Sequence, residues 1–171
     1  NVGNDFSHCL DFFSNKIPPT GINAAGYQPI CQRYKNQYHF ASLYHRQHRA
    51  PLFSAYILSP ADGKRPKNIW MYEPQLVLSD ANPEMEPFHI PVDQNVIESQ
   101  AVLEDYRNSN FTRGHLNPSV HQKTKEDRKA TFTLTNIVPQ RGGSNSGPCN
   151  QLENEVLRKF KAFCTGKMLT V

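Results

Sequence analysis

The sequence predicts an α+β fold with a mixed or antiparallel sheet and flanking helices. Apolar and polar side chains alternate over residues 52–58 and 130–138, as they do in strands that bury one face. Apolar residues recur at helical spacing over 150–163, which is typical of a helix with one buried side. The 171 residues suit one domain, so we expect a single unit over 1–171, with residues 1–29 wrapping around it.

Composition places the chain among globular proteins. Hydrophobic residues make up 37% and charged residues 20%, which allows a core and argues against disorder. The formal net charge of +4 permits a polyanionic partner without requiring one. No apolar run reaches the roughly 18 residues of a membrane-spanning helix, so we expect no membrane partner. The chain starts at Asn1 without a signal peptide, and we interpret it as a mature, secreted form.

The four cysteines are Cys9, Cys31, Cys149 and Cys164. No C-x-x-C pair is present, which favours two disulfides over a zinc site, with four reduced thiols as the alternative. Four cysteines allow three pairings, and the sequence does not choose among them. The pairing we expect joins Cys9 to Cys164, which would tie the two ends together, and Cys31 to Cys149.

The first half of the chain predicts a hairpin. Residues 1–29 contain many prolines and glycines, with a short helix near residues 9–13. The aromatic segment 38–44 is expected to pair with the strand at 52–58. The next elements are strands at 68–72 and 75–78, interrupted by Pro74, and a proline-rich surface loop at 79–97.

The second half predicts a strand, a turn and a helix. In the strand at 130–138, Phe132 and Leu134 would face one side, Thr131, Thr133 and Thr135 the other, and Pro139 would end it. A flexible turn is expected at 142–148. The helix at 150–163 would bury Leu152, Val156, Phe160 and Phe163 and could pair Glu155 with Lys159. A strand at 168–171 is expected to be the last sheet edge, unless the chain was cut and a C-terminal partner fragment is missing.

Three polar motifs follow one another in the second half. They are Arg113-Gly114-His115-Leu116-Asn117-Pro118, then Thr135-Asn136-Ile137-Val138-Pro139-Gln140, then Asn145 in a Ser/Gly stretch with Leu152-Glu153 after it. A neutral imidazole such as His115 can take a proton from water near neutral pH. Asn145 offers an amide oxygen to a hard cation such as Mg²⁺, and Glu153 could orient its water shell. The guanidinium of Arg113 is planar and can donate two parallel hydrogen bonds to the oxygens of a phosphate.

Each residue also has a purely structural interpretation. A histidine after Arg-Gly is usually a solvated turn residue, and Asn145 suits a helix N-cap. Glu153 suits a helix surface, and Asn136 suits a backbone contact at a strand end. Their order along the chain is what favours a site of two strands and a helix around one cation, able to cleave phosphodiester bonds.

These motifs resemble those of the DNA/RNA non-specific endonuclease family, the ββα-metal nucleases. The segments Ile30-Cys31-Gln32-Arg33-Tyr34, His48 to Ala55 and Glu73-Pro74-Gln75-Leu76 are more similar to its vertebrate endonuclease domain-containing 1 branch, which is secreted. The resemblance runs from about residue 30 onward. It implies Mg²⁺-dependent hydrolysis of DNA and RNA, with Mn²⁺ or Ca²⁺ as alternative ions.

The resemblance also implies residue roles. His115 would be the general base, Asn145 the metal ligand and Glu153 a water-mediated metal contact. Arg113 would bind phosphate or support the site, and Asn136 would support the catalytic strand. Arg49 and Arg141 are further candidates for contacts with nucleic acid. The aromatic residues between Tyr34 and Tyr44 alternate with cations and could stack bases, but a half-buried strand is the interpretation we favour.

Two departures from the family pattern bear on activity. The family places aspartate before the Arg-Gly-His motif, and this chain has Thr112. Thr112 also completes a glycosylation sequon at Asn110, five residues before His115. In addition, relatives continue with more strands after the segment that matches 167–171.

Three functions remain open from the sequence. The first is a secreted metal-dependent endonuclease. The second is a weak or inactive family member that acts as a secreted binding or structural protein. The third, a cationic host-defence protein, ranks last because the chain has no cationic amphipathic helix. DNA and RNA are the expected partners, and the oligomeric state is not predicted.

Overall fold

Three antiparallel strands form the main sheet of the computed structural model, which describes residues 1–22, 25–163 and 169–170. The strands are β1 (Tyr27–Tyr34), β2 (Gln37–His45) and β3 (Ala50–Ala55), in that spatial order. Lys35 and Asn36 have positive φ angles and connect β1 to β2 as a two-residue hairpin loop. The expected pairing of 38–44 with 52–58 is confirmed, with Ala41 opposite Ala55.

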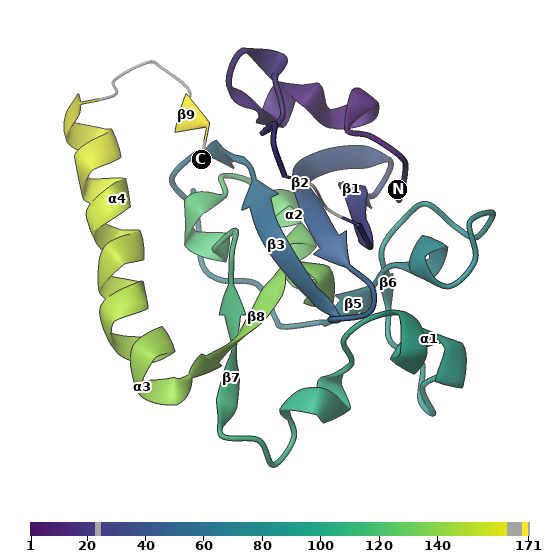
Figure 1. Ribbon diagram of the computed structural model, residues 1–171. Helices are drawn as coiled ribbons and strands as arrows, with labels where there is room; N and C mark the ends of the chain where they lie inside the picture. Colours follow the sequence, from purple (N-terminus) through teal and green to yellow (C-terminus); the bar gives the residue numbers. More distant parts are fainter. Residues whose placement is uncertain (23–24, 164–168, 171) are drawn as a thin grey trace.

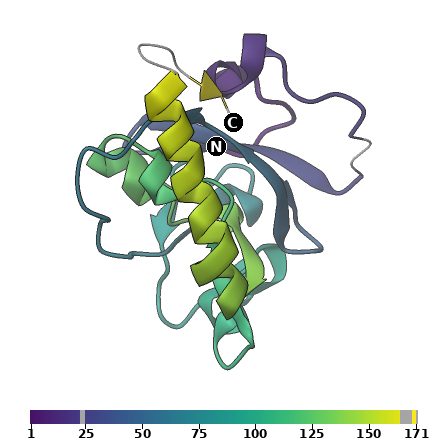
Figure 2. The ribbon, with the colours of Figure 1, turned by 90° about the vertical axis from the view of Figure 1, so that its left-hand side faces the viewer.

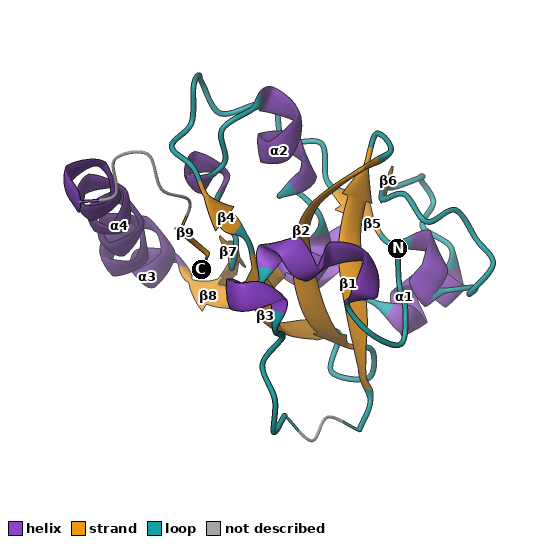
Figure 3. Ribbon diagram, turned by 90° about the horizontal axis from the view of Figure 1, so that it is seen from above, coloured by secondary structure: helices purple, strands orange, loops and turns teal. Residues whose placement is uncertain are grey.

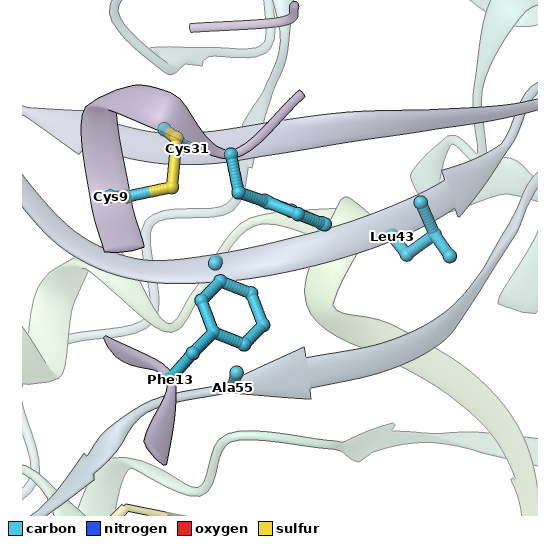
Figure 4. Packing of buried hydrophobic residues seen from close by; sticks show 7 residues of the cluster. Cys9, Phe13, Cys31, Leu43 and Ala55 are labelled. Atoms are coloured by element: carbon cyan, nitrogen blue, oxygen red, sulfur yellow. A yellow bond between two sulfur atoms is a disulfide. The ribbon is translucent and has the colours of Figure 1, made fainter. Parts of the chain in front are cut away.

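Both faces of this sheet are covered, so β2 is buried along most of its length. The N-terminal turns Ser7–Phe12 and Ser14–Lys16 cross one face (Figure 3). There Phe6 belongs to a buried cluster. Phe13 and Leu43 of the same cluster are labelled in Figure 4. On the other face Phe40 is fully buried with residues from later elements. These contacts position the rest of the chain relative to the sheet.

The disulfide pairing differs from the one expected. Cys9 is bonded to Cys31, with Cα atoms 5.7 Å apart (Figure 4). Cys9 lies in the first N-terminal turn and Cys31 in β1, and both belong to the same buried cluster, which brings the two side chains together. Cys149 has no disulfide partner among the described residues, and Cys164 lies outside them.

The prediction of a strand at 130–138 is wrong for most of that range. Helix α2 (Lys125–Ala130) fills its start, a 3-10 turn (Leu134–Asn136) follows, and β8 (Ile137–Arg141) begins only at Ile137. Thr124 and Asp127 form a capping box that begins α2. The alternating threonines suggested an exposed face, yet Thr131, Thr133 and Thr135 are all fully buried. Pro139 does not end β8 but pairs with Arg113 inside it.

The middle of the chain has short elements. The strand expected at 52–58 is divided between β3 and β4 (Ile57–Leu58), and that expected at 68–72 is reduced to β5 (Met71–Tyr72). The 75–78 strand is largely the 3-10 turn Pro74–Leu76, and strand β6 (Glu86–Pro87) was not expected. The expected 79–97 loop contains β6 and the start of α1 (Gln94–Ser99). Two further 3-10 turns are Leu103–Tyr106 and Ser119–His121.

A ribbon and a long helix complete the fold. Strand β7 (Phe111–His115) pairs antiparallel with β8, and the chain then turns directly into α3 (Gly142–Ser144), a π turn (Asn145–Cys149) and α4 (Asn150–Phe163). The expected flexible turn at 142–148 is therefore helical. The expected helix 150–163 is confirmed, and it runs along one side of the molecule (Figures 1 and 2). Within the expected strand 168–171, β9 (Leu169–Thr170) pairs with β4.

Helix α4 packs on the core with a stripe that differs slightly from the expected one. Val156, Leu157 and Phe160 contact the cluster around Phe40, whereas Leu152 is 64% exposed. The expected pair of Glu155 with Lys159 forms at 3.9 Å. None of the described helices has the length and apolarity to cross a membrane.

Candidate active site

A cleft of about 650 Å³ separates the β7–β8 ribbon from the segment that runs through α3 into α4. Its lining includes Arg113, His115, Asn145 and Glu153, which the sequence motifs had singled out. Arg113 and His115 come from β7, and the other two come from the helical segment. Because β8 leads directly into that segment, the ribbon fixes the relative position of the two halves of the cleft.

Gly114 is needed because the Gln140 side chain packs against it. The two residues are close on the paired strands, and a Cβ atom added at Gly114 would lie 2.2 Å from Gln140 Oε1. Gln140 Nε2 is in turn 3.7 Å from Cys149 Sγ. The glycine therefore permits the glutamine to connect the strand that carries His115 to the helical half of the cleft.

His115 is half-buried between two aromatic rings. Its ring centroid lies 5.7 Å from that of Trp70 and 5.1 Å from that of Phe132. Burial, and after it the positive charges of Arg65 and Arg113, together lower the pKa of His115 to about 3. The imidazole is therefore neutral at pH 7. Within the described chain its buried Nε2 atom has no hydrogen-bond partner.

Two arginines flank the imidazole. The Arg113 guanidinium lies 4.7 Å from the Trp70 ring centroid, and that of Arg65 lies 5.1 Å from the Phe132 centroid. Arg65, which lies in the loop between β4 and β5, was not predicted from the sequence motifs. The basic run Lys64-Arg65-Pro66-Lys67 was the signal that could have found it. Both arginines line the cleft, so two cations face any ligand there.

Asn145 is held by hydrogen bonds to β7. Its Nδ2 donates to the Thr112 hydroxyl at 3.1 Å and to the Arg113 carbonyl at 3.3 Å. The Thr112 hydroxyl donates in turn to the Gln140 carbonyl at 3.0 Å. With the amide nitrogen engaged by these acceptors, the amide oxygen is the group left to bind a cation. Asn145 lies inside the helical segment and is not an N-cap.

Glu153 lines the other wall, half-buried on α4. Burial raises the pKa of its carboxyl, and the positive charge of Arg65 acts in the opposite direction. Its backbone carbonyl accepts a hydrogen bond from His121 Nε2 at 3.0 Å, and His121 Nδ1 accepts one from the Tyr56 hydroxyl at 2.8 Å. Burial lowers the pKa of His121, which agrees with this neutral tautomer. The chain of bonds ties α4 to the core beside the cleft.

Asn136 lies behind the cleft and does not line it. Its side chain is fully buried and bonds the backbone of Asn117 twice, at 2.9 and 3.0 Å. It also bonds the Thr131 carbonyl and accepts from the Ser54 hydroxyl. The backbone carbonyl of Asn136 accepts from Leu116 N at 3.0 Å. These bonds fix the turn that follows His115, which is a supporting role.

Arg49 and Arg141 lie outside this cleft. Arg49 Nε donates to the Gln100 carbonyl at 3.0 Å, and its guanidinium pairs with Asp105. Arg141 is exposed at the end of β8, opposite Phe111. The segment 34–44 is more buried than the half-buried strand expected there, because β2 is buried on both faces and Phe40 and Tyr44 are fully buried. Asn110 is exposed just before β7.

The donor atoms in the cleft suit a hard cation. The described residues contain no group of three or more His, Cys, Asp and Glu placed to hold a metal. A cage of several protein ligands is therefore absent from that part of the chain. The Asn145 amide oxygen and the Glu153 carboxylate remain on the cleft walls as oxygen donors. Mg²⁺ keeps most of its waters and needs only one or two such donors, so this pair fits it.

A model of the family described as DNA/RNA non-specific endonuclease matches residues 19–168. The chain belongs to the DNA/RNA non-specific endonuclease family. Among relatives in this family, the Endonuclease domain-containing 1 proteins of Homo sapiens and Mus musculus are 35% and 33% identical to it, each over 78% of this chain. The chain spans 27% of the length of those two proteins.

Two further comparisons give a partial sequence match and a likeness of fold. The mitochondrial nuclease EXOG of Danio rerio is 44% identical over 61 residues, which are 33% of this chain and 18% of EXOG. A crystal structure of an EndoG/EndoGI complex aligns with a TM-score of 0.51 and 23% identity, covering 75% of this chain and 47% of that one. That likeness agrees with the mixed α+β architecture.

Proposed function

We propose that this chain is the catalytic part of a metal-dependent endonuclease that hydrolyses phosphodiester bonds of DNA and RNA. The observation that carries the proposal is the convergence of a neutral His115 and an oriented Asn145 on one cleft. Membership of the nuclease family supports the same reaction. Arg65 and Arg113 give the cleft the positive charge that a phosphate ligand needs.

In the proposed reaction, His115 accepts a proton from a water molecule while the water oxygen attacks phosphorus. The bond from phosphorus to the 3′ oxygen breaks, and that oxygen takes a proton from solvent. The low pKa of His115 keeps its imidazole unprotonated and available as a base. Arg65 and Arg113 bind the phosphate oxygens and hold the phosphodiester beside His115.

Asn145 and Glu153 are the proposed cation site, through the amide oxygen of Asn145 and water molecules oriented by Glu153. A bound Mg²⁺ ion, with Mn²⁺ or Ca²⁺ as alternatives, supplies positive charge to the phosphate and to the leaving oxygen. Thr112 stands where the family has aspartate, and its hydroxyl accepts the hydrogen bond that orients Asn145. On this proposal the substitution therefore preserves the orientation of the metal ligand.

We further propose that the protein works outside the cytosol. The Cys9–Cys31 disulfide supports this, because such bonds persist in oxidising compartments. The exposed sequon at Asn110 is compatible with glycosylation there. DNA and RNA are the proposed substrates.

Cleavage of supercoiled plasmid and total RNA tests the function. The purified protein is incubated with Mg²⁺ or with EDTA, beside His115→Ala. His89→Ala is the matched control, since His89 is exposed and does not line the cleft. We expect cleavage only with metal, loss in His115→Ala and retention in His89→Ala. A folded wild-type protein that cleaves neither substrate would instead support the second interpretation, an inactive binding protein.

A further inference from the structure

The active-site cleft continues into two further hollows along the molecule. It shares Thr112 and Arg113 with a second cleft of about 400 Å³. The second shares Tyr106 and Phe111 with a third of about 600 Å³, which reaches His48. Because the clefts have lining residues in common, they lie next to one another on the molecule. We call the second and third clefts together the aromatic groove.

Two aromatic side chains occupy the middle of this groove. Phe111 starts β7 and is 46% exposed, although it is large and apolar. Tyr106 ends the turn before β7 and packs against the buried cluster of Ala101, Leu134 and Ile137, which supports its side chain. Exposed aromatic faces fixed by a scaffold are the usual platforms for stacked nucleic-acid bases. The segment that carries them lies at the lower edge of the molecule (Figure 1).

The charges around the groove are mostly paired. Arg107 pairs with Glu104 at 3.3 Å, and Arg49 pairs with Asp105. Arg113, at the junction with the active-site cleft, has no carboxylate within ion-pair distance in the described part of the chain. The groove therefore offers aromatic faces along its length and a cation at its junction. That chemistry suits unpaired bases with a phosphate held at one end, more than the two charged backbones of a duplex.

We propose that the aromatic groove binds the nucleotides next to the cleaved bond in single-stranded form, with bases stacked on Phe111 and Tyr106. The proposal rests on the proposed function of the adjoining cleft. Phe111 lies four residues before His115 on one strand, or about 13 Å. At a stacked spacing of about 3.4 Å this distance spans about four nucleotides. Affinity for a single strand should therefore rise with length until the groove is filled.

Binding of fluorescein-labelled oligothymidylates of increasing length, from about two to about twelve nucleotides, tests this proposal. The titrations are made in EDTA, so that cleavage does not interfere. The variants are Phe111→Ala, Phe111→Trp as the conservative replacement, and Leu78→Ala as a control, because Leu78 is also exposed and apolar and lines none of the three clefts. Thermal melts confirm that each variant is folded.

We expect the wild-type protein, Leu78→Ala and Phe111→Trp to bind longer strands more tightly than dinucleotides. Phe111→Ala should weaken binding of the longer strands about 5- to 140-fold, which is the loss of one stacked base. Equal length dependence in Phe111→Ala, equal binding of a duplex, or no binding by folded wild-type protein would overturn the proposal. Plasmid cleavage measured separately shows whether the proposed function itself stands, because binding in EDTA does not need catalysis.

Discussion

The Thr112 hydroxyl accepts a hydrogen bond from Asn145 Nδ2 at 3.1 Å and donates one to the Gln140 carbonyl at 3.0 Å. A single hydroxyl thus connects both strands of the ribbon to the side chain that is the proposed metal ligand. A threonine hydroxyl can act as donor and acceptor at once, whereas an ionised aspartate only accepts. The Gln140 carbonyl contact is therefore one that an ionised carboxylate at this position does not make.

Replacing Thr112 with valine should weaken the proposed cation site. Valine keeps the shape of threonine but removes one of the two acceptors of Asn145 Nδ2, so the amide is held only by the 3.3 Å bond to the Arg113 carbonyl. Loss of such supporting bonds commonly lowers metal affinity by about 10- to 100-fold. Calorimetric titration with Mg²⁺ or Mn²⁺ measures the change, and Thr112→Ser, which keeps the hydroxyl, should retain the wild-type affinity. Equal affinity in the valine and serine variants would contradict this role.

Removing the charge of Arg65 should shift to higher pH the point at which kcat falls on the acid side of its pH profile. Burial, and after it the positive charges of Arg65 and Arg113, lower the pKa of His115 to about 3, so the wild-type imidazole stays unprotonated well below pH 6. Arg65→Gln removes one cation that opposes the imidazolium, which raises that pKa. The measurement is kcat against pH. Arg107 is exposed and does not line this cleft, so Arg107→Gln should leave the acid side of the kcat profile unchanged.

The same pKa shift predicts how stability depends on pH. His115 titrates lower in the folded protein than in the unfolded chain, so between pH 6 and pH 4 the unfolded chain binds more protons and stability falls as pH falls. A His115→Gln variant lacks this contribution, and its free energy of unfolding should fall less over that range. Urea titrations at pH 7, 6, 5 and about 4 compare the two proteins. Parallel pH curves would show that His115 does not titrate differently on folding.

Gly114→Ala should destabilise the ribbon by about 1–3 kcal/mol, the usual cost of overpacking. The new Cβ would meet Gln140 Oε1 at 2.2 Å, so the glutamine has to leave its place. Adding Gln140→Ala removes the atoms in conflict and should recover most of the loss. Urea unfolding of the two single variants and the double variant gives the coupling energy. Additive losses would mean that the two side chains do not compete for this space.

Removing the Cys9–Cys31 bond should cost about 3 kcal/mol, because it closes a loop of 22 residues in the unfolded chain. The double variant Cys9→Ser with Cys31→Ser tests this by urea unfolding beside the wild-type protein. Wild-type protein in reductant should lose a similar amount, whereas the double variant should not respond to reductant at this bond. A double variant as stable as the oxidised wild type would contradict the expectation.

Local patterns predicted some parts of this molecule better than others. The spacing of apolar residues predicted α4 with the bounds Asn150–Phe163, since one stripe packs on a core and the opposite face is polar. The threonines at 131, 133 and 135 misled the strand assignment because each hydroxyl is buried in a hydrogen bond, as with Thr131 and the Arg128 carbonyl. Neighbouring residues in sequence do not reveal such bonds.

In the candidate site too, the sequence identified residues in local motifs but not those brought in from distant segments. His115, Asn145 and Glu153 were singled out from motif order, and the structure places them on one cleft. Arg65 comes from a loop 50 residues before His115, and only the tertiary fold brings it there. The pairing of Cys9 with Cys31 likewise depends on how the N-terminal turns cross β1. Contacts between distant segments are set by the packing of the sheet faces.

The attachment of α4 has a thermodynamic consequence for the cleft. Asn145 and Glu153 belong to the helical segment from α3 to α4, residues 142–163, which we call the arm. The arm packs on the core through Val156 and Phe160 and is also held by the hydrogen bond from His121. A ligand that touches both the arm and β7 binds only when the arm is docked, so its binding free energy also opposes undocking. Ligand should therefore slow amide hydrogen exchange along the whole arm. Weakening a remote apolar contact of the arm lowers affinity without altering any group that the ligand touches.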